Sequence, residues 1–298
     1  MAAKFRVGFI GIGNMGWPMA SHIAAAGWPL SVYDKDAGRA VRFADEHRGA
    51  SAARSFADLA PADAIVTMLP TGRDVRGVLV EEDGGLAKHL RPGTLVIDMS
   101  SSEPVGTREL GAALKPRGLT LMDAPVSGAV PRAKTATLAI MIGCDDREAV
   151  ERAKPLLSSM GNRLFEVGRL GCGHALKALN NFVAATGFNA ACEALLAGKR
   201  FGLDPATLME VLNAGTARNF ATEFVMKEQV IEGRHATGFS LGLLTKDVRI
   251  AADLAAAVKL DAPLMRLVSD RWTLARDRLG PARDNSEAIG CWDEDLPR

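Results

Sequence analysis

An amine and two amides in one long apolar segment are the side chains best placed for chemistry. Residues 171–200 open with glycines and then run apolar, with Ala and Leu dominating, which predicts a long and largely buried helix. Lys177 and Asn181 are four residues apart and share one face of this helix, with Asn180 beside them. Burial lowers the pKa of a lysine toward the working pH, and such a lysine can both donate and accept a proton. The alternative is a purely structural network, in which hydrogen bonds and ion pairs satisfy these buried polar groups. This segment alone does not distinguish the catalytic role from the structural one.

A glycine-rich turn near the start of the chain predicts a dinucleotide site. Residues 5–10 are a short apolar run typical of a buried parallel strand, and the turn GIGNMG follows it, with its glycines in the GxGxxG spacing. Gly11 permits the tight turn, Gly13 lets the backbone approach a pyrophosphate, and Gly16 lets the helix pack closely on the strand. The N-terminus of the following helix supplies N–H groups for the phosphates.

A second strand ends at Asp34, which bears on the choice of nucleotide. Its carboxylate can accept from a ribose 2′-hydroxyl and would repel a 2′-phosphate, which favours NAD. Lys35 and Arg39 lie close enough in the sequence to meet the phosphate of NADP, so NADP stays open. Glycines after a strand are often only a turn, and the prediction therefore depends on the full order of strand, turn, helix, strand and acid.

Four further apolar runs continue the alternation, at residues 64–70, 94–100, 119–128 and 138–143. This order predicts an α/β fold with a Rossmann-type doubly wound sheet, in which ligands bind beyond the carboxyl ends of the strands. The loops that contain Leu69, Ser101 and Ser127 are therefore expected on one edge of the sheet. Such serines more commonly cap helices or form turns. For Ser127, a role in a turn and a contact with a ligand are therefore both retained as interpretations.

Beyond a last short strand at residues 161–168, the apolar spacing becomes helical. The long helix is followed by helical patterns, which lie at residues 205–215, 217–233, 239–260 and 263–280. We predict a dinucleotide-binding domain at residues 1–166 and an all-helical domain for substrate binding and oligomerisation at 167–298. One dominating apolar helix in a small helical domain also predicts a homodimer or homotetramer. Ile289 and Trp292 suggest that the polar tail docks on the protein.

The composition argues against several classes of function. The 298 residues include 36 Lys and Arg and 35 Asp and Glu, and this balance argues against nucleic-acid or membrane partners. The four cysteines form no CxxC pair and have no histidine at metal-ligand spacing, so we expect no metal and reduced thiols in a cytoplasmic protein. The first residues, MAAKFRVGFIGIG, show no signal-peptide pattern.

Several of these segments occur together in a familiar order. GFIGIGNMGWPMA, VTMLP, DMSSSEP, MDAPVSGA, GCGHALKALNN and LLTKD, spread over residues 5–280, resemble the β-hydroxyacid dehydrogenase family. That family includes 3-hydroxyisobutyrate dehydrogenase and tartronate semialdehyde reductase, with 6-phosphogluconate dehydrogenase a more distant relative. The resemblance implies that Lys177 is the catalytic residue, and it implies substrate-binding positions at Ser127, Gly128, Asn180, Asn181 and Asp247. The cofactor positions expected from the turn and the resemblance are Gly11, Gly13, Asn14, Met15, Gly16, Asp34, Leu69, Pro70, Asp74, Ser101 and Lys246.

The chain departs from the family pattern at four positions. Ala129 and Ala136 stand where the family has glycines, and an alanine held at positive φ would be strained. Ser101 replaces a threonine. His174 stands where relatives commonly have glutamine, and we expect it to be an exposed neighbour of the helix cap, with contact to substrate as the alternative.

The resemblance implies an NAD(P)-dependent oxidoreductase that interconverts a small 3-hydroxy acid and its semialdehyde or ketone. A hydride would pass between substrate and nicotinamide while Lys177 moves the proton. An NADPH-dependent reductase of short aldehydes or semialdehydes shares these motifs. A catalytically silent dinucleotide-binding module is the alternative outside enzymes, although such proteins tend to lose the lysine, as imine reductases do.

Overall fold

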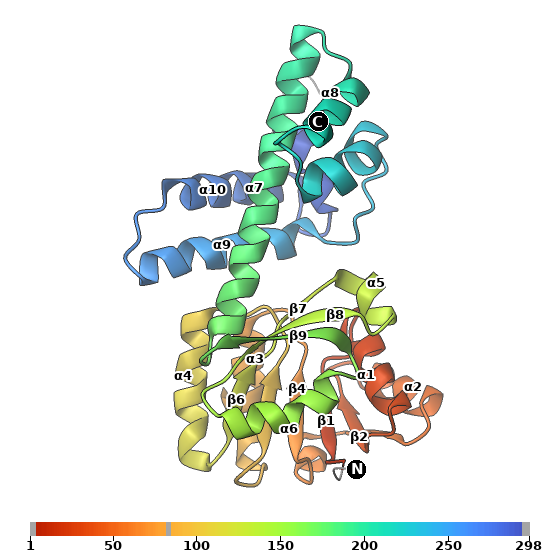
Figure 1. Cartoon of the computed structure of the whole chain (residues 1–298). Helices are drawn as coiled ribbons and strands as arrows, with labels where there is room; N and C mark the ends of the chain where they lie inside the picture. Colours follow the sequence, from red (N-terminus) through yellow and green to blue (C-terminus); the bar gives the residue numbers. More distant parts are fainter. Residues whose placement is uncertain (1–3, 82–84, 294–298) are drawn as a thin grey trace. The chain divides into compact units, whose positions relative to one another are not determined.

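The computed structural model describes residues 4–81 and 85–293. The chain divides into two compact units, Met1–Lys177 and Ala178–Arg298. The division falls inside one continuous helix, α7 (Cys172–Phe201), which begins in unit 1 and continues into unit 2 (Figure 1). The boundary predicted between residues 166 and 167 lies before this helix and stays a prediction. Residues 294–298 of the predicted docking tail lie outside the described residues, as do residues 1–3 of the N-terminal segment.

Unit 1 is built on one mixed sheet, drawn in red to green in Figure 1. In the described part of the chain the strand order is β3-β2-β1-β4-β5-β6-β8-β7, and β9 pairs with β8. The strands are β1 (Val7–Ile10), β2 (Leu30–Tyr33), β3 (Ala50–Ala52), β4 (Ala64–Thr67), β5 (Leu95–Asp98), β6 (Thr120–Asp123), β7 (Val126–Ser127), β8 (Leu138–Gly143) and β9 (Gly161–Gly168). The first six are parallel, and β8 runs antiparallel to β6 and β7.

The parallel strands are apolar throughout because helices cover both faces of the sheet. Successive residues point to opposite faces, so Phe9 enters one core cluster and Ile10 the other. Helices α1 (Gly16–Ala25), α2 (Ala37–Glu46) and α6 (Arg147–Leu157) contribute to the first cluster, and α3 (Gly72–Arg76) and α4 (Pro104–Leu114) to the second. The predicted doubly wound fold of the first half is thus confirmed.

Two details of the sheet differ from the sequence prediction. The single strand expected over residues 119–128 is interrupted between β6 and β7, because Pro125 has no backbone N–H to continue the ladder. The edge strand β3 was not predicted, because it has only three residues and little burial to produce a pattern. Helix α5 (Ala129–Lys134) follows β7 directly.

Unit 2 is helical, as predicted. Its elements after α7 are α8 (Pro205–Ala214), the π-helix η6 (Ala221–Ile231), α9 (Leu241–Ala257), α10 (Pro263–Leu279) and the short 3₁₀ segment η7 (Asn285–Cys291). Asp204 caps α8 by accepting from the Thr207 N–H at 2.8 Å, and Pro205 takes the first helical position. None of the helices in the described ranges is apolar over a length that would cross a lipid bilayer.

An aromatic cluster fixes the tail to the core of unit 2. The ring of Trp292 lies 6.0 Å from that of Phe188 on α7 and 5.6 Å from that of Trp272 on α10. Trp272 is fully buried, and Ile289 is buried with it. The tail therefore docks on α7 and α10 as far as Asp293, which accepts from Arg200 at 2.9 Å.

Candidate active site

The glycine turn between β1 and α1 has the shape that a pyrophosphate requires. Gly11 has φ +90°, a conformation that glycine adopts without strain. A Cβ on Gly16 would lie 1.9 Å from the carbonyl oxygen of Gly11, so only glycine lets α1 begin this close to the strand. By contrast, apart from Gly13 itself and its two chain neighbours, no described heavy atom lies within 4 Å of the place that a Cβ on Gly13 would occupy. The turn thus presents open space at Gly13, next to the N-terminus of α1, and a bound dinucleotide fits this arrangement. Asn14 is exposed and Met15 partly buried in the same turn.

Asp34 joins this turn to the end of β2. Its Oδ2 accepts from the Ile12 N–H at 3.0 Å, and its Oδ1 accepts from the Asp36 N–H at 3.0 Å. Arg39 on α2 donates to both oxygens, at 3.2 and 3.3 Å. The carboxylate is buried, with 6% of the side chain exposed, while 37% of the Arg39 side chain is exposed. The arginine is therefore directed at the acid and partly balances its charge.

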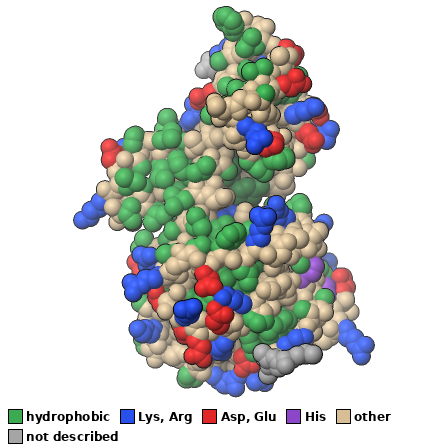
Figure 2. Space-filling model, viewed as in Figure 1, with side chains coloured by type: hydrophobic (Ala, Val, Ile, Leu, Met, Phe, Trp, Pro, Cys, Tyr) green, Lys and Arg blue, Asp and Glu red, His purple; other side chains and the backbone are tan. Residues whose placement is uncertain are grey.

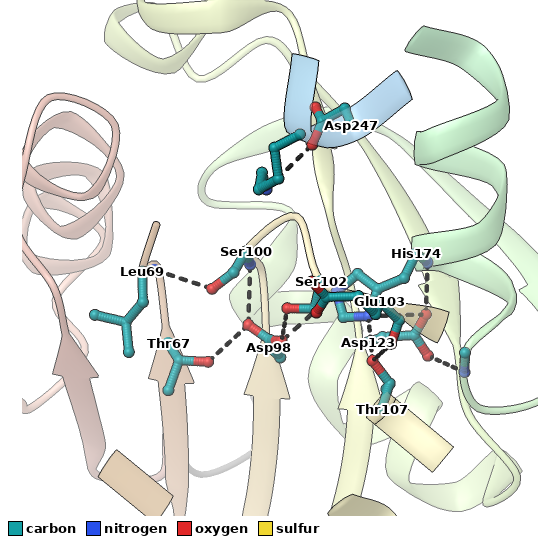
Figure 3. Close-up of polar contacts among 12 residues, drawn as sticks. Thr67, Leu69, Asp98, Ser100, Ser102, Glu103, Thr107, Asp123, His174 and Asp247 are labelled. Carbon is teal, nitrogen blue, oxygen red and sulfur yellow. Dashed lines mark hydrogen bonds and ion pairs between the residues drawn. The ribbon is translucent and has the colours of Figure 1, made fainter. Parts of the chain in front are cut away.

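The loops after β4 and β5 are held against each other at the carboxyl edge of the sheet. The Leu69 N–H donates to Ser100 Oγ at 2.9 Å. Asp98, the last residue of β5, accepts from Thr67 Oγ1 at 2.9 Å and from Ser102 Oγ at 2.8 Å (Figure 3). This confirms that the loops of residues 69–70 and 100–102 share one edge. The partly buried Ser101 lies between two anchored neighbours.

Pro70 and Asp74 frame the start of α3. Pro70 is exposed, and Thr71 caps the helix by accepting from the Asp74 N–H at 3.1 Å. The Asp74 carboxylate accepts in turn from the Thr71 hydroxyl at 2.6 Å. These contacts belong to the helix itself, and the expected role of Asp74 beside the cofactor stays a prediction.

Ser127 and Gly128 follow β6 beyond the same edge, where β7 leads into α5. Gly128 has φ +130°. The next residue, Ala129, has φ +51°, and Ala136 at the far end of the loop has φ +53°. Both alanines are thus held in the left-handed region, as the comparison with the family pattern suggested. The left-handed region costs a residue with a Cβ about 1–2 kcal/mol, so this loop stores strain at both of its ends.

The start of α7, the helix that carries Lys177, is held by Asp123, the last residue of β6. Asp123 Oδ1 accepts from the Gly171 N–H at 2.7 Å, and Oδ2 accepts from the His174 N–H at 2.8 Å. The carboxyl group thereby satisfies two N–H groups at the start of α7. Burial raises the pKa of Asp123, against the opposing effects of His174 and of the two N–H donors. Arg108 on α4 adds a bond from Nε to the Leu170 carbonyl at 2.9 Å.

His174 is buried, so the expectation of an exposed residue is wrong. Only 1% of the residue is exposed. Its Nδ1 lies 2.8 Å from Thr107 Oγ1 on α4, and its Nε2 lies 3.6 Å from Asp98 Oδ2 (Figure 3). The apolar pattern around it hides this, because the partners come from residues about seventy positions earlier. Lys177 follows one helical turn later and is partly buried.

The predicted site residues of unit 2 form a network of their own. Asn181 Nδ2 donates to Asp247 Oδ2 at 2.6 Å, and Asn180 Nδ2 donates to Asn181 Oδ1 at 3.0 Å. Lys246 Nζ lies 3.1 Å from Asp247 Oδ1. Asp247 is 3% exposed. The buried carboxylate therefore orients Asn181 and Lys246, and its expected role as a direct substrate contact stays a prediction.

Family models match nearly the whole chain. Residues 6–168 match the NAD binding domain of 6-phosphogluconate dehydrogenase, and residues 171–292 match the NAD-binding region of NADP-dependent 3-hydroxyisobutyrate dehydrogenase. The NAD-dependent L-serine dehydrogenase of Pseudomonas aeruginosa is 36% identical over 279 residues, which are 90% of this chain and 91% of the relative. The 3-hydroxyisobutyrate dehydrogenase of the same organism is 34% identical over 275 residues, again 90% and 91%.

The chain belongs to the β-hydroxyacid dehydrogenase family. A solved structure of Mycobacterium tuberculosis 3-hydroxyisobutyrate dehydrogenase with L-serine agrees, with a TM-score of 0.87 and 32% identity over 97% of this chain and 99% of that one. This family member is an NAD(P)-dependent oxidoreductase of small hydroxy acids. Among its described residues, no group of three or more His, Cys, Asp or Glu side chains could hold a metal ion.

Two acids of this dehydrogenase were missed as functional residues. Asp98 and Asp123 end the apolar runs of β5 and β6, and each was treated only as part of a strand. A charge at the carboxyl end of a buried parallel strand was the available signal, because such an acid needs a partner to stay there.

Proposed function

We propose that this dehydrogenase interconverts a small 3-hydroxy acid and its semialdehyde, with Lys177 as the general acid and base. The observation that carries the proposal is the placement of Lys177 one helical turn beyond His174, in the helix whose start Asp123 fixes to the carboxyl end of β6. The open turn at Gly13 and the loops of residues 69–70 and 100–102 belong to the same edge of the same sheet. Ligands of doubly wound folds bind at this edge.

Bound NAD(P) supplies the chemistry of accepting or returning the hydride. The amine of Lys177 takes the hydroxyl proton during oxidation and returns it during reduction. Ser127 and the backbone N–H groups beside Gly128 bind the carboxylate of the substrate. Asn181, whose amide Asp247 holds, donates to the substrate oxygen and keeps it in register. The same residues serve both directions.

The substrate class follows from the relatives and defines the test. The relatives are named for L-serine and 3-hydroxyisobutyrate, which are both 3-hydroxy acids with a small group on the second carbon. Initial rates should be measured with L-serine, 3-hydroxyisobutyrate, 2-(hydroxymethyl)glutarate and simple semialdehydes, each with both nucleotides. A 3-hydroxy acid or its semialdehyde is expected to be turned over fastest. Activity confined to short aldehydes without a carboxylate would contradict the proposal.

We also propose that NAD is the preferred nucleotide, because the Asp34 carboxylate is buried beside the glycine turn. Asp34→Asn should raise the kcat/KM for NADP relative to that for NAD by about tenfold to 100-fold, the range for a hydrogen bond to a charged group. The amide keeps an oxygen for the Ile12 N–H while the charge that repels a 2′-phosphate is lost and Arg39 is released. Asp45→Asn, at an exposed position of α2, makes the same change in net charge and should leave the ratio unaltered. An unchanged ratio in Asp34→Asn would remove the basis for the NAD preference.

Exposed apolar side chains of unit 2 support a homo-oligomer, either a dimer or a tetramer. Figure 2 shows hydrophobic side chains gathered over α9 and α10, where Val258, Leu260, Leu264 and Leu267 are each more than half exposed. Patches of this kind mark protein–protein contacts in soluble proteins. A second copy is expected to cover them.

Light scattering at micromolar concentration should therefore give at least twice the 31.6 kDa of one chain. Leu264→Glu with Leu267→Glu should reduce that mass toward a single chain, since a buried carboxylate without a partner is costly. Val105→Glu, at an exposed valine of α4 in unit 1, is the matched control and should keep the parent mass. A single-chain mass for the parent protein would count against the oligomer.

The cysteines support a reducing, cytoplasmic location. All four are free thiols, and burial raises the pKa of Cys144, Cys192 and Cys291.

A further inference from the structure

We propose that His174 is a positioning residue, which ties the first turn of the lysine-bearing helix to α4, the helix that follows the cofactor-side loop after β5. The inference rests on the proposed role of Lys177 and extends it to a residue that cannot touch the substrate. The His174 side chain is 0% exposed. Any effect that it has on the reaction must therefore pass through the groups that it contacts.

The histidine connects three elements of unit 1. Its own backbone N–H donates to Asp123 at the end of β6, its Nδ1 contacts Thr107 on α4, and its Nε2 faces Asp98 at the end of β5. Thr107 Oγ1 also donates to the Glu103 carbonyl at 3.0 Å. A hydroxyl has only one hydrogen, so Nδ1 must be the donor to Thr107. This assigns a proton to Nδ1. Nε2 lies 3.6 Å from Asp98 Oδ2 and has no hydrogen-bond partner among the described residues, so the bond from Nδ1 to Thr107 is the one that holds the ring.

Asp98, which lies beside Nε2, is itself held by the loop after β5. It accepts from Ser102 Oγ at 2.8 Å and from the Ser100 N–H at 3.0 Å. Ser100 Oγ in turn accepts from the Leu69 N–H. Hydrogen bonds thus join the loop after β4 to the loop after β5, and Asp98 lies beside His174 at the start of α7 (Figure 3). The side chains of Ser100, Asp98 and His174 are all buried.

The consequence for Lys177 follows from helix geometry. Lys177 lies three residues after His174 in a regular helix, so a shift of the first turn moves the amine with it. The bond between Nδ1 and Thr107 favours a single arrangement of the first turn, because an alternative would leave a buried donor or acceptor unpaired. The bond thereby places the lysine in a fixed relation to α4, which follows a loop that is expected to line the cofactor.

The test separates the Nδ1 bond from simple packing. His174→Asn keeps a side-chain N–H donor near the position of Nδ1, whereas His174→Leu fills similar volume without a donor. His174→Leu should lower kcat by about tenfold to 100-fold, the cost of a misplaced catalytic group, with the dissociation constant for NADH unchanged. His174→Asn should recover most of that loss. A fall in melting temperature with parent kcat in both variants would show a merely structural residue and would overturn the inference.

Thr107 supplies an independent arm. Thr107→Val removes the hydroxyl that accepts from Nδ1, and Thr107→Ser retains it. Thr107→Val should lower kcat as His174→Leu does, and the double variant should lose no more than either single variant, because all remove the same bond. Additive losses in the double variant would contradict the coupling. If His174→Leu fails to fold, the Thr107 pair carries the same test.

A readout without turnover distinguishes failure of this inference from failure of the proposed function. An amine-reactive reagent followed by mass spectrometry measures the labelling rate of Lys177, with the exposed Lys35 as internal reference. His174→Leu and Thr107→Val should change the Lys177 rate relative to Lys35, and His174→Asn should restore it. If the parent protein turns over no hydroxy acid, the proposed function fails, yet the labelling still decides whether His174 positions Lys177. If the labelling rate of Lys177 relative to Lys35 equals that of the parent protein in all variants, the positioning role is overturned.

Discussion

Lys177→Ala is expected to lower kcat on the true hydroxy-acid substrate by about 10²- to 10⁴-fold, the usual contribution of a positioned general acid and base. The variant should bind NADH with the parent affinity, because the glycine turn and Asp34, the residues proposed to hold the nucleotide, lie outside α7. The loss should appear equally in kcat and kcat/KM, as for an interaction made only in the transition state. Steady-state rates and NADH fluorescence titration measure the two halves of this expectation.

Two matched variants decide what the lysine contributes. Lys177→Arg keeps a positive charge, but a guanidinium does not release its proton at working pH, so it should be nearly as inactive as Lys177→Ala. Leu176→Ala changes the neighbouring residue of α7, which is 42% exposed, and should keep turnover near the parent rate. Near-parent turnover in Lys177→Ala would falsify the assignment of the acid and base. Activity retained by Lys177→Arg would show that charge alone is enough.

Gly13→Val is expected to reduce the affinity for both nucleotides by roughly 100-fold, or about 2.7 kcal/mol, without lowering the melting temperature. No described heavy atom beyond the two chain neighbours would lie within 4 Å of the new Cβ, so the fold has no reason to change. The added side chain would instead occupy the space where the pyrophosphate approaches the backbone. Isothermal titration with NADH and a thermal melt of the free protein test this pair of outcomes.

The comparison with Gly16 separates binding from folding at the same turn. A Cβ on Gly16 would lie 1.9 Å from a backbone carbonyl oxygen, which cannot move without displacing β1 or α1. Gly16→Ala should therefore unfold the protein or lower its melting temperature strongly. Gly13→Val, in contrast, should be as stable as the parent. If Gly13→Val is stable and binds NADH normally, the nucleotide does not approach the turn at Gly13.

The linear order of patterns was enough to determine the class of this protein. Short apolar runs, the glycine spacing and Asp34 specify a doubly wound nucleotide-binding sheet, because each depends on residues that are neighbours in the chain. The helical second half and its Asp204–Pro205 start are also local features, and the structure confirms them. Lys177 and Asn181 could be singled out because their polarity interrupts an apolar helix.

Only the tertiary structure decided how those residues are held. Asp247 orients Asn181 from 66 positions later in the chain, and His174 meets Thr107 from 67 positions later. Burial of His174 could not be read from α7 alone, since a histidine near a helix start is compatible with solvent. Pairing between distant segments depends on which strand ends the fold brings together. Spacing along the chain does not show which strand ends become neighbours. The folded sheet does, because it places them side by side at its carboxyl edge.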